Sequence, residues 1–481
     1  MTLKKKLLVA TAAGALTAAA AVPAMALENE FHGMYKLKYF LSNYESGGSG
    51  SIVVPSVGST ASSNTGPFKS STAANYFEQR ARIFYTAKAN DDLKLVTGFE
   101  IDSVFGDKAQ GSLPSGANTG TGNFSSSTTA FRNSGGALES DAVNLETKWV
   151  YLDFNIPSTP VNVKTGIQPI KDTFKGVFID ADIAGILTSA KFGALGTTAG
   201  YFRSYDNTTG TAVVPRGTDN QDIATLAASY AISKDLTVGG QYFYFDDNRT
   251  SPRVQAHVIG LTGEAKFGPA TVNGFAAYQA GYVKNPQKTI SAFAANVSGK
   301  LKAGPGTAKA TFLYVSGDED NTDGVVHDWQ AIQTRTSGPT ATGTMANSFN
   351  DSGMMLLNRN TAAGGTSTDQ SIIYGNNNNG RGNIIAALGY DATITPKVYT
   401  NFNVGFGFNA ENKIAGTDKD RNASQFLGTE LNGEVGYKMF DNLTASAQVA
   451  YVILGPYFKG IAGGQDAVDP YTARAVLSYA F

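Results

Sequence analysis

The chain ends on the stretch YTARAVLSYAF, residues 471–481, in which apolar and polar side chains alternate with a period of two. Alternation of this period predicts a β-strand with two different faces. Leu477, Tyr479 and Phe481 share one face, and Arg474 lies on the other. One face is therefore apolar up to the last residue. This is typical of the strand that closes a membrane β-barrel with its aromatic end at the membrane interface.

The rest of the chain repeats this alternation between connections that are short and long in turn. Short turns are predicted near residues 90–92, 157–160, 193–196, 233–235, 268–269, 303–306, 395–397 and 440–442. Longer connections are predicted near residues 43–73, 107–141, 170–184, 206–221, 246–253, 284–288, 317–381, 411–424 and 455–470. The connection 317–381 is the longest, and we expect it to be the least ordered.

Eight short and nine long connections separate eighteen strands and leave both chain ends on the short-turn side. We therefore predict an all-β fold, a transmembrane antiparallel β-barrel of about 18 strands with 16 as the alternative count. The short turns would lie in the periplasm and the long loops outside the cell. A soluble β-sandwich array or an adhesin would show the same alternation within strands. Neither of these folds would predict that short turns and long loops alternate along the chain.

The first 26 residues predict a secretory signal peptide. Three lysines precede an apolar run, residues 7–22, and the small-residue triplet AMA at 24–26. The alternative is a membrane anchor. Removal of residues 1–26 leaves 27–481 as a single barrel domain of the outer membrane, since no other stretch is as apolar as a spanning helix of about 20 residues.

Composition agrees with a membrane barrel and excludes several other classes. Cysteine is absent, which excludes disulfides and thiolate chemistry. Charged residues make up 16% of the chain, against about 25% in a typical soluble domain. The net charge of −1 gives no reason to expect nucleic acid as a partner. Aromatic pairs and runs near strand ends are interpreted as interfacial girdles, namely Tyr201-Phe202, Tyr242 to Phe245 and Phe402, Phe406 and Phe408.

Residues for catalysis are scarce. The three histidines, His32, His257 and His327, are far apart in sequence, and no nucleophile elbow, P-loop or zinc-protease motif occurs. The stretch GFGFNA, residues 405–410, imitates a dinucleotide fingerprint but lies within an aromatic strand, so we interpret it as small residues in a sheet. We therefore expect no enzymatic activity and no cofactor.

The alternation predicts which side chains face lipid and which line the pore. Lipid-facing positions are predicted at Phe31, Tyr35, Leu37, Ile83, Tyr85, Val143, Trp149 and Leu477. Basic residues on the opposite face would line the pore, namely Lys36, Lys38, Arg80, Arg82, Lys148 and Lys164.

One connection looks suited to constrict the pore. Residues 168–185 neither alternate nor have low complexity, and they mix apolar side chains with Asp172, Asp180 and Asp182. We expect this loop to fold inward and to turn these carboxylates towards the basic wall. An ordinary extracellular loop with a helical turn is the alternative.

An acidic segment predicts a candidate calcium site. Asp318, Glu319, Asp320, Asn321 and Asp323 provide the oxygen ligands that Ca²⁺ prefers. The match to an EF-hand loop is partial, because its twelfth position would be a glutamine. A solvated acidic loop at a strand end is the alternative.

The closing Tyr479 and Phe481, the signal-type start and the two loop segments resemble Gram-negative outer-membrane porins of the 16–18-strand type. The opening LENEFHGMYKLKYF, residues 27–40, is similar to major porins of metal-reducing delta-proteobacteria, and the acidic segment is similar to alginate-export-like porins. The resemblance implies a water-filled channel for passive diffusion of small hydrophilic solutes and ions.

Three alternative functions stay open: a substrate-selective channel, the sheath of a trans-outer-membrane electron-transfer complex, and a non-conducting surface or adhesin barrel. The expected partners are outer-membrane lipid and lipopolysaccharide, the barrel-assembly machinery that reads the terminal aromatic, and two further copies in a homotrimer.

Overall fold

The computed structural model describes residues 27–45, 73–106, 145–206, 216–248, 253–284, 287–320, 322–332, 346–362, 371–373, 375–411, 424–460 and 466–481. The predicted signal peptide, residues 1–26, lies outside these ranges. Among the residues described, none belongs to a helix long and apolar enough to cross a membrane.

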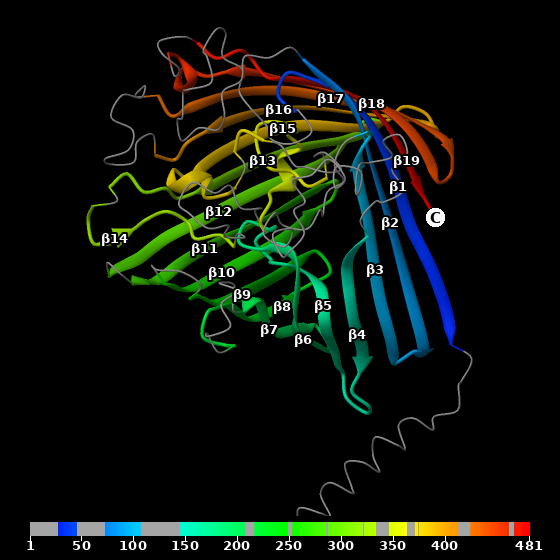
Figure 1. Ribbon diagram of the computed structural model, residues 1–481, viewed down its shortest axis with the longest axis vertical. Coiled ribbons are helices and arrows are strands. Elements are labelled where there is room, and N and C mark those ends of the chain that lie inside the picture. Colours follow the sequence, from blue (N-terminus) through cyan, green and yellow to red (C-terminus); the bar gives the residue numbers. More distant parts are fainter. Residues whose placement is uncertain are drawn as a thin grey trace, which may run out of the picture.

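Eighteen antiparallel strands form one closed sheet around a central space (Figure 1). The strands are β1 (Glu28–Ser42), β2 (Ala74–Asn90), β3 (Leu93–Val104), β4 (Glu146–Asn155), β5 (Val161–Lys171), β6 (Asp180–Phe192), β7 (Leu195–Asp206), β8 (Asn220–Ala231), β9 (Leu236–Asp247), β10 (Arg253–Phe267), β11 (Ala270–Lys284), β12 (Lys288–Ala303), β13 (Gly306–Val315), β15 (Asn383–Thr393), β16 (Val398–Phe408), β17 (Phe426–Phe440), β18 (Leu443–Leu454) and β19 (Tyr471–Ala480). A nineteenth, two-residue strand, β14 (Val325–Val326), pairs in parallel with β12 and is not part of the antiparallel wall. The predicted count of eighteen is confirmed.

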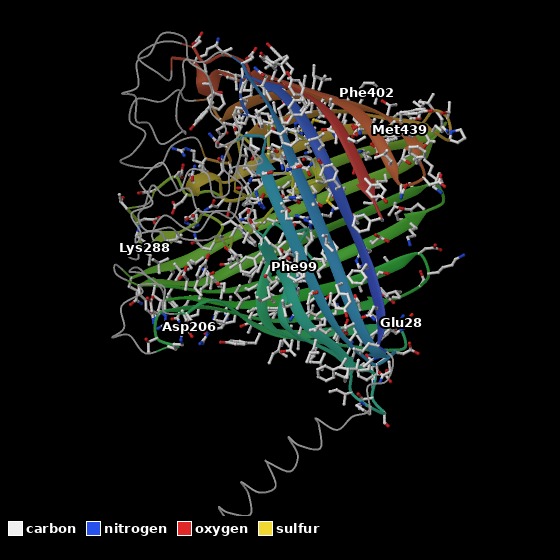
Figure 2. All side chains as sticks on the ribbon, turned by 45° about the vertical axis from the view of Figure 1, so that its right-hand side comes forward. Glu28, Phe99, Asp206, Lys288, Phe402 and Met439 are labelled. Atoms are coloured by element: carbon white, nitrogen blue, oxygen red, sulfur yellow. The ribbon has the colours of Figure 1, made fainter. Side chains whose placement is uncertain are left out.

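The seventeen connections fall where they were predicted, but the alternation of short and long is incomplete, because the β11–β12 connection, 285–287, is as short as the turns at the other end. Two of the shortest have Gly268 and Gly304 at φ 59° and 58°, each followed by a proline. Glycine with positive φ at the first turn position matches the right-handed twist of the flanking strands, which fixes the register of both hairpins. Figure 2 places Glu28 and Met439 at the short-turn end and Asp206 and Lys288 at the end of the long loops.

The barrel closes where β1 meets β19. Their register runs from Met34 opposite Ala480 to Ser42 opposite Thr472. The Phe481 amide donates to the Gly33 carbonyl at 3.1 Å, and the Gly33 amide donates to Phe481 at 2.9 Å. A side chain at position 33 would lie 2.7 Å from the Phe481 ring, so glycine leaves room for the terminal aromatic. The final residue thus takes part in the closing ladder.

The outer surface of the barrel is apolar. Phe402, which is 59% exposed, and Met439 point away from the barrel in Figure 2. Six of the predicted lipid-facing residues lie in the outward register: Phe31, Tyr35, Leu37, Ile83, Tyr85 and Leu477. Val143 lies outside the described residues.

The prediction for Trp149 is wrong because of a β-bulge. Gly98 of β3 pairs with Trp149, and Phe99 pairs with Thr147, so Lys148 is the extra residue. One extra residue reverses the alternation. Trp149 therefore turns towards the inner face, where its ring lies 4.6 Å from that of Phe84.

The largest apolar core lies inside the barrel. It joins described parts of two extracellular connections, 172–179 and 316–382, to inward-facing side chains of β7–β18. Figure 1 shows β14, which belongs to the second connection, at the rim of the barrel beside the loop end of β12. We call the residues 172–179, 322–332, 346–362, 371–373 and 375–382 the plug. Phe202, Phe243 and Phe245 face the plug and are buried, so their assignment to the interfacial girdle is wrong. The expectation that 317–381 is the least ordered connection is also wrong for its described parts, which are packed in this core.

Candidate functional site

The connection between β5 and β6 folds into the lumen, as predicted. Phe174, Val177, Phe178 and Ile179 are fully buried. The Phe174 ring lies 5.5 Å from Phe275, and the Phe178 ring lies 4.9 Å from Phe243. These four apolar side chains lie within six residues and would be costly to expose to water at a loop tip, so burial against β9 and β11 explains the inward fold.

Asp172 does not line the channel, which corrects the prediction for this residue. Its carboxylate accepts hydrogen bonds from the backbone amides of Gly176, Phe178 and Ile179 at 2.8, 2.8 and 2.6 Å. Burial raises the pKa of Asp172 to about 6, although these three donors act in the opposite direction. The side chain therefore shapes the loop from inside instead of facing solutes.

The loop tip is attached to the far wall by Lys175. Its Nζ donates to Asp351 Oδ2 at 2.6 Å, Asn273 Oδ1 at 2.7 Å and Ser298 Oγ at 2.8 Å. Burial lowers the pKa of Lys175, and the paired Asp351 opposes this. The tip is thus linked to β11, to β12 and to the second part of the plug.

The second part of the plug is held by a carboxylate that the sequence analysis missed. Glu430 on β17 is fully buried and accepts the backbone amides of Met355, Leu356 and Leu357 at 2.7, 3.0 and 2.6 Å. A lone acid in an alternating strand gives no sequence signal of such a role.

The first four residues of the GFGFNA stretch, 405–408, end β16 and include small residues in the sheet, as interpreted. Side chains added at Gly405 and Gly407 would meet Met354 and Leu357, so these glycines make room for the plug.

The opposite side of the lumen, formed by β19 and β1–β5, carries charged residues. Arg80 donates to Asp102 through Nε at 2.7 Å and Nη2 at 2.5 Å, and it lies 3.4 Å from Glu100. Arg82 pairs with Glu100. Both arginines are partly exposed, at 19% and 27% of their side-chain surface. The predicted basic wall is therefore a mixed wall, in which acids of the neighbouring strand face each arginine.

The two predicted lysines of β1 belong to this wall. Lys36 lies directly opposite Arg80 in the β1–β2 register. Two like charges in such positions repel each other, which favours anions near them. Lys38 is 3% exposed and lies opposite Glu78.

A buried ion pair missed by the sequence analysis completes the wall. Arg474 Nη2 donates to Glu45 Oε1 at 2.6 Å, and both side chains are almost fully buried. The Thr472 hydroxyl donates to Glu45 at 2.5 Å. Glu45 follows β1 immediately, so the start of the next connection also turns inward. Its position three residues beyond the strand gave no signal of this contact.

The last two predicted lysines and two acids lie near β4–β6. Lys164 is placed over the Tyr151 ring at 5.8 Å. Lys148 Nζ pairs with Asp182 Oδ2 at 2.5 Å. Asp180 accepts from Lys171 at 2.8 Å and from the Ser348 hydroxyl at 2.6 Å. Both aspartates belong to β6 and are engaged by neighbours, so the predicted acidic row facing the basic wall is not formed by this loop.

The carboxylates of the candidate calcium segment serve local turns. Asp318 accepts the amides of Asp320 and His327, Asp320 accepts the Thr322 hydroxyl at 2.6 Å, and Asp323 accepts the Val325 amide at 2.8 Å. Asn321 lies outside the described residues, and the Glu319 side chain is exposed. Within the described part of the chain, no three His, Asp or Glu side chains are grouped so that they could hold a metal ion. The calcium site stays a prediction.

Comparison with known proteins identifies the architecture. No family model matches the sequence, and no curated protein matches it. The structure is similar to that of Pseudomonas aeruginosa OpdK solved with vanillate, with a TM-score of 0.52 and 11% identity over 94% of this chain and 98% of that one. P. aeruginosa OpdL gives a TM-score of 0.51 with 12% identity over 94% and 99%, and Acinetobacter baumannii OccAB4 gives 0.50 with 10% over 94% and 98%. The fold is that of outer-membrane porins, and the protein is an integral β-barrel of the outer membrane.

Proposed function

We propose that the barrel is a diffusion channel for small hydrophilic solutes and ions, and that the conducting path follows the charged side of the lumen. The observation that carries this proposal is the partial exposure of Arg80 and Arg82 opposite a plug that is packed on an apolar core. Charged side chains that keep contact with water mark the hydrated part of the interior, since a buried unhydrated ion is costly. The plug narrows the path, so width and charge together set selectivity.

A second candidate is selectivity for small anionic solutes. Lys36 directly opposite Arg80 supports it, because two neighbouring cations attract an anion, although Asp102 and Glu100 already neutralise part of the charge of Arg80. OpdK, whose structure is described with vanillate, has a similar fold at 11% identity. We extend that ligand class, a small aromatic carboxylate, to this chain only as a hypothesis.

The remaining alternatives have less support. An electron-transfer sheath needs a lumen wide enough for a protein, and the plug is an argument against it. A non-conducting adhesin barrel gives no reason for a hydrated charged wall. The narrower resemblance to delta-proteobacterial and alginate-export-like porins stays a prediction. Three associations also stay predictions: with lipopolysaccharide, with the barrel-assembly machinery, and with two further copies in a homotrimer. The absence of enzymatic activity is a prediction as well.

Planar-bilayer recording of the purified protein tests the proposal. We expect stepwise ionic currents and a reversal potential in asymmetric KCl that is displaced from zero. Addition of vanillate, with benzyl alcohol as the uncharged control, separates the two candidates: a selective channel shows reduced current with vanillate alone. Absence of any current would refute both.

A further inference from the structure

The hydrogen-bonded wall is unusually short between β4 and β7. The β4–β5 ladder has six residue pairs, from Val150 opposite Ile167 to Asn155 opposite Asn162. The β6–β7 ladder has eight and stops at Gly185 opposite Phe202, whereas β10 and β11 pair over fifteen. A strand needs about 9–11 residues to cross the membrane. The backbone ladder therefore stops within the extracellular half of the membrane on this side.

The wall is short because the upper part of the β5–β6 hairpin leaves it. We call residues 168–184 the hairpin tip. Its two arms stay paired with each other up to Lys171 opposite Asp180, but within the described residues neither arm pairs with β4 or β7. The bend begins at Gly166, whose φ of 131° is open to glycine and strained for other residues. Ile170 and Ile183 then enter the apolar core of the plug.

Pro169 indicates that the tip is built with a free edge. The amide of Asp172 donates to Ile179 on the β6 side. Successive residues of a strand direct their N–H groups to opposite neighbours, so position 169 faces β4. Proline has no N–H and is confined to strand edges. At position 169 the β4 side of the tip therefore has no N–H group that would need a partner in β4.

Side chains of β4 reach across the resulting notch to β6. Trp149 Nε1 donates to Asp182 Oδ1 at 2.7 Å, and Lys148 pairs with the same carboxylate. The Trp149 ring also lies 4.6 Å from the ring of Phe84, which is in the inward register of β2. The notch thus connects the inner face of the wall with the outward register of β6. Oε1 of Glu146 and Oε1 of Gln168 are buried beside it without a donor in the described protein.

We propose that this notch, bounded by Lys148, Trp149 and Asp182, is a lateral opening through which amphipathic solutes pass between the lumen and the outer leaflet. The inference rests on the proposed channel and adds a substrate class to it. The lipid-facing surface just below the notch is apolar, with Ile167 and Ile186 exposed by 38% and 51%. An apolar tail can lie on these isoleucines while a charged head exchanges with the Lys148–Asp182 pair. If only lipid and no water reached this part of the wall, backbone N–H and C=O groups at the strand edges would lack hydrogen-bond partners. Such groups are too costly in the hydrocarbon core of a bilayer.

Tryptophan fluorescence tests whether lipid and water meet at the notch. The chain has two tryptophans, so Trp329→Phe leaves Trp149 as the only one. In proteoliposomes we expect Trp149 to be quenched both by phospholipids with brominated acyl chains and by aqueous iodide. The control variant Trp149→Phe keeps Trp329, which is fully buried in the plug and should respond to neither quencher. Quenching of Trp149 by one agent alone, or by neither, overturns the proposal.

A second measurement does not depend on tryptophan replacement. The chain has no cysteine, so a single spin label can be placed at Ala184→Cys in the hairpin tip. Ala280→Cys, outward on the fully paired β11, is the matched control. We expect the label at 184 to collide with a water-soluble nickel complex and with oxygen, and the label at 280 to collide with oxygen alone. Equal profiles at the two sites overturn the proposal.

Transport separates failure of the opening from failure of the channel. Lys148→Cys with Asp182→Cys allows a flexible bifunctional thiol reagent to seal the notch. Efflux of entrapped octanesulfonate and methanesulfonate is measured on this variant before and after sealing. Sealing should slow octanesulfonate several-fold and leave methanesulfonate unchanged. Equal effects on both, or none, refute the lateral opening, whereas no efflux of either before sealing refutes the channel itself.

Discussion

The two sides of the lumen obey the same strand alternation and use it in opposite ways. On β7–β18 many inward-facing residues, such as Phe243, are apolar and lie under the plug. On β19 and β1–β5 inward-facing residues such as Arg80 and Asp102 are charged and pair with the next strand. Both sides turn apolar residues to lipid. The comparison teaches that the inner face of a large barrel is not polar by necessity: where a loop covers it, much of it is apolar and its polar residues bond the loop.

This difference also decides how each side resists change. The plugged side is held by buried apolar area and by a few buried anchors such as Glu430. The charged side is held mostly by paired, partly hydrated charges, which contribute little stability individually. Mutations on the plugged side should therefore change structure and pore size, and those on the charged side should change selectivity.

The largest effect is expected from Phe178→Ala. Phe178 is fully buried between Phe243 and Trp329, and such truncations cost about 3–5 kcal/mol. We expect the plug to detach in part of the molecules and the single-channel conductance to rise. Phe402→Ala, on the lipid-facing surface, should leave conductance unchanged. A folded Phe178→Ala barrel with the original conductance would mean that the plug does not limit the pore.

The next effect distinguishes the two faces of β2. Ile83→Arg places a charge in lipid at a cost of about 2–4 kcal/mol near the midplane. Arg82→Ser on the inner face should destabilise the barrel far less, because Glu100 still has Arg80 as a cationic partner at 3.4 Å. Urea unfolding in lipid vesicles measures both. Equal losses of stability would show that the assignment of faces on β2 is wrong.

A third prediction concerns the charged side alone. Replacing Arg80 and Arg82 with Ser removes two cations and leaves Asp102 and Glu100 facing water. A charge at 4 Å contributes about 1 kcal/mol in water, so the cation-to-anion permeability ratio should rise about fivefold per charge removed. Glu100→Gln with Asp102→Asn should shift it the other way. Reversal potentials in asymmetric KCl measure both, and unchanged values would place the narrowest part elsewhere.

The smallest effect is a pH dependence on the plugged side. The pKa of Asp172 is about 6 in the packed loop, above the usual value of about 4 that it regains when the loop opens. Between these values the packed loop binds more protons, so acidification from pH 7 to pH 5 should stabilise it. The amides of Gly176 and Phe178, after correction for intrinsic exchange, should then be better protected from hydrogen exchange at pH 5. Asp172→Asn should abolish this difference, and protection that falls with pH would contradict the assignment.

The sequence predicts the barrel well because its signal is local. Period-two alternation, turn residues and a terminal aromatic each need only neighbouring residues, and they give the strand number and the closing strand. Trp149 fails because the bulge at Lys148 depends on how β4 meets β3.

The plug could be inferred in part from residues 241–245, QYFYF. Apolar side chains on both faces of this stretch mean that something apolar covers the inner one. The inward fold of residues 168–185 was predicted, but the contacts that it makes with this stretch were not. The contacts of Phe178 with β9 and of Glu430 with residues 355–357 join segments far apart in the sequence, and no local pattern encodes them.

The closing contact of Gly33 with Phe481 sets the order in which the barrel can form. Joining positions so far apart in a free chain would cost about 5 kcal/mol of loop-closure entropy, whereas each hairpin joins close neighbours at little cost. Hairpins should therefore zip first, and the β1–β19 contact should come last, when the curved sheet already brings its edges together. Until the last residue is in place, two strand edges stay open and prone to pair with other chains. The chain thus spends its most vulnerable time with seventeen of eighteen strand contacts made, which is when a protein that holds the final strand would help most.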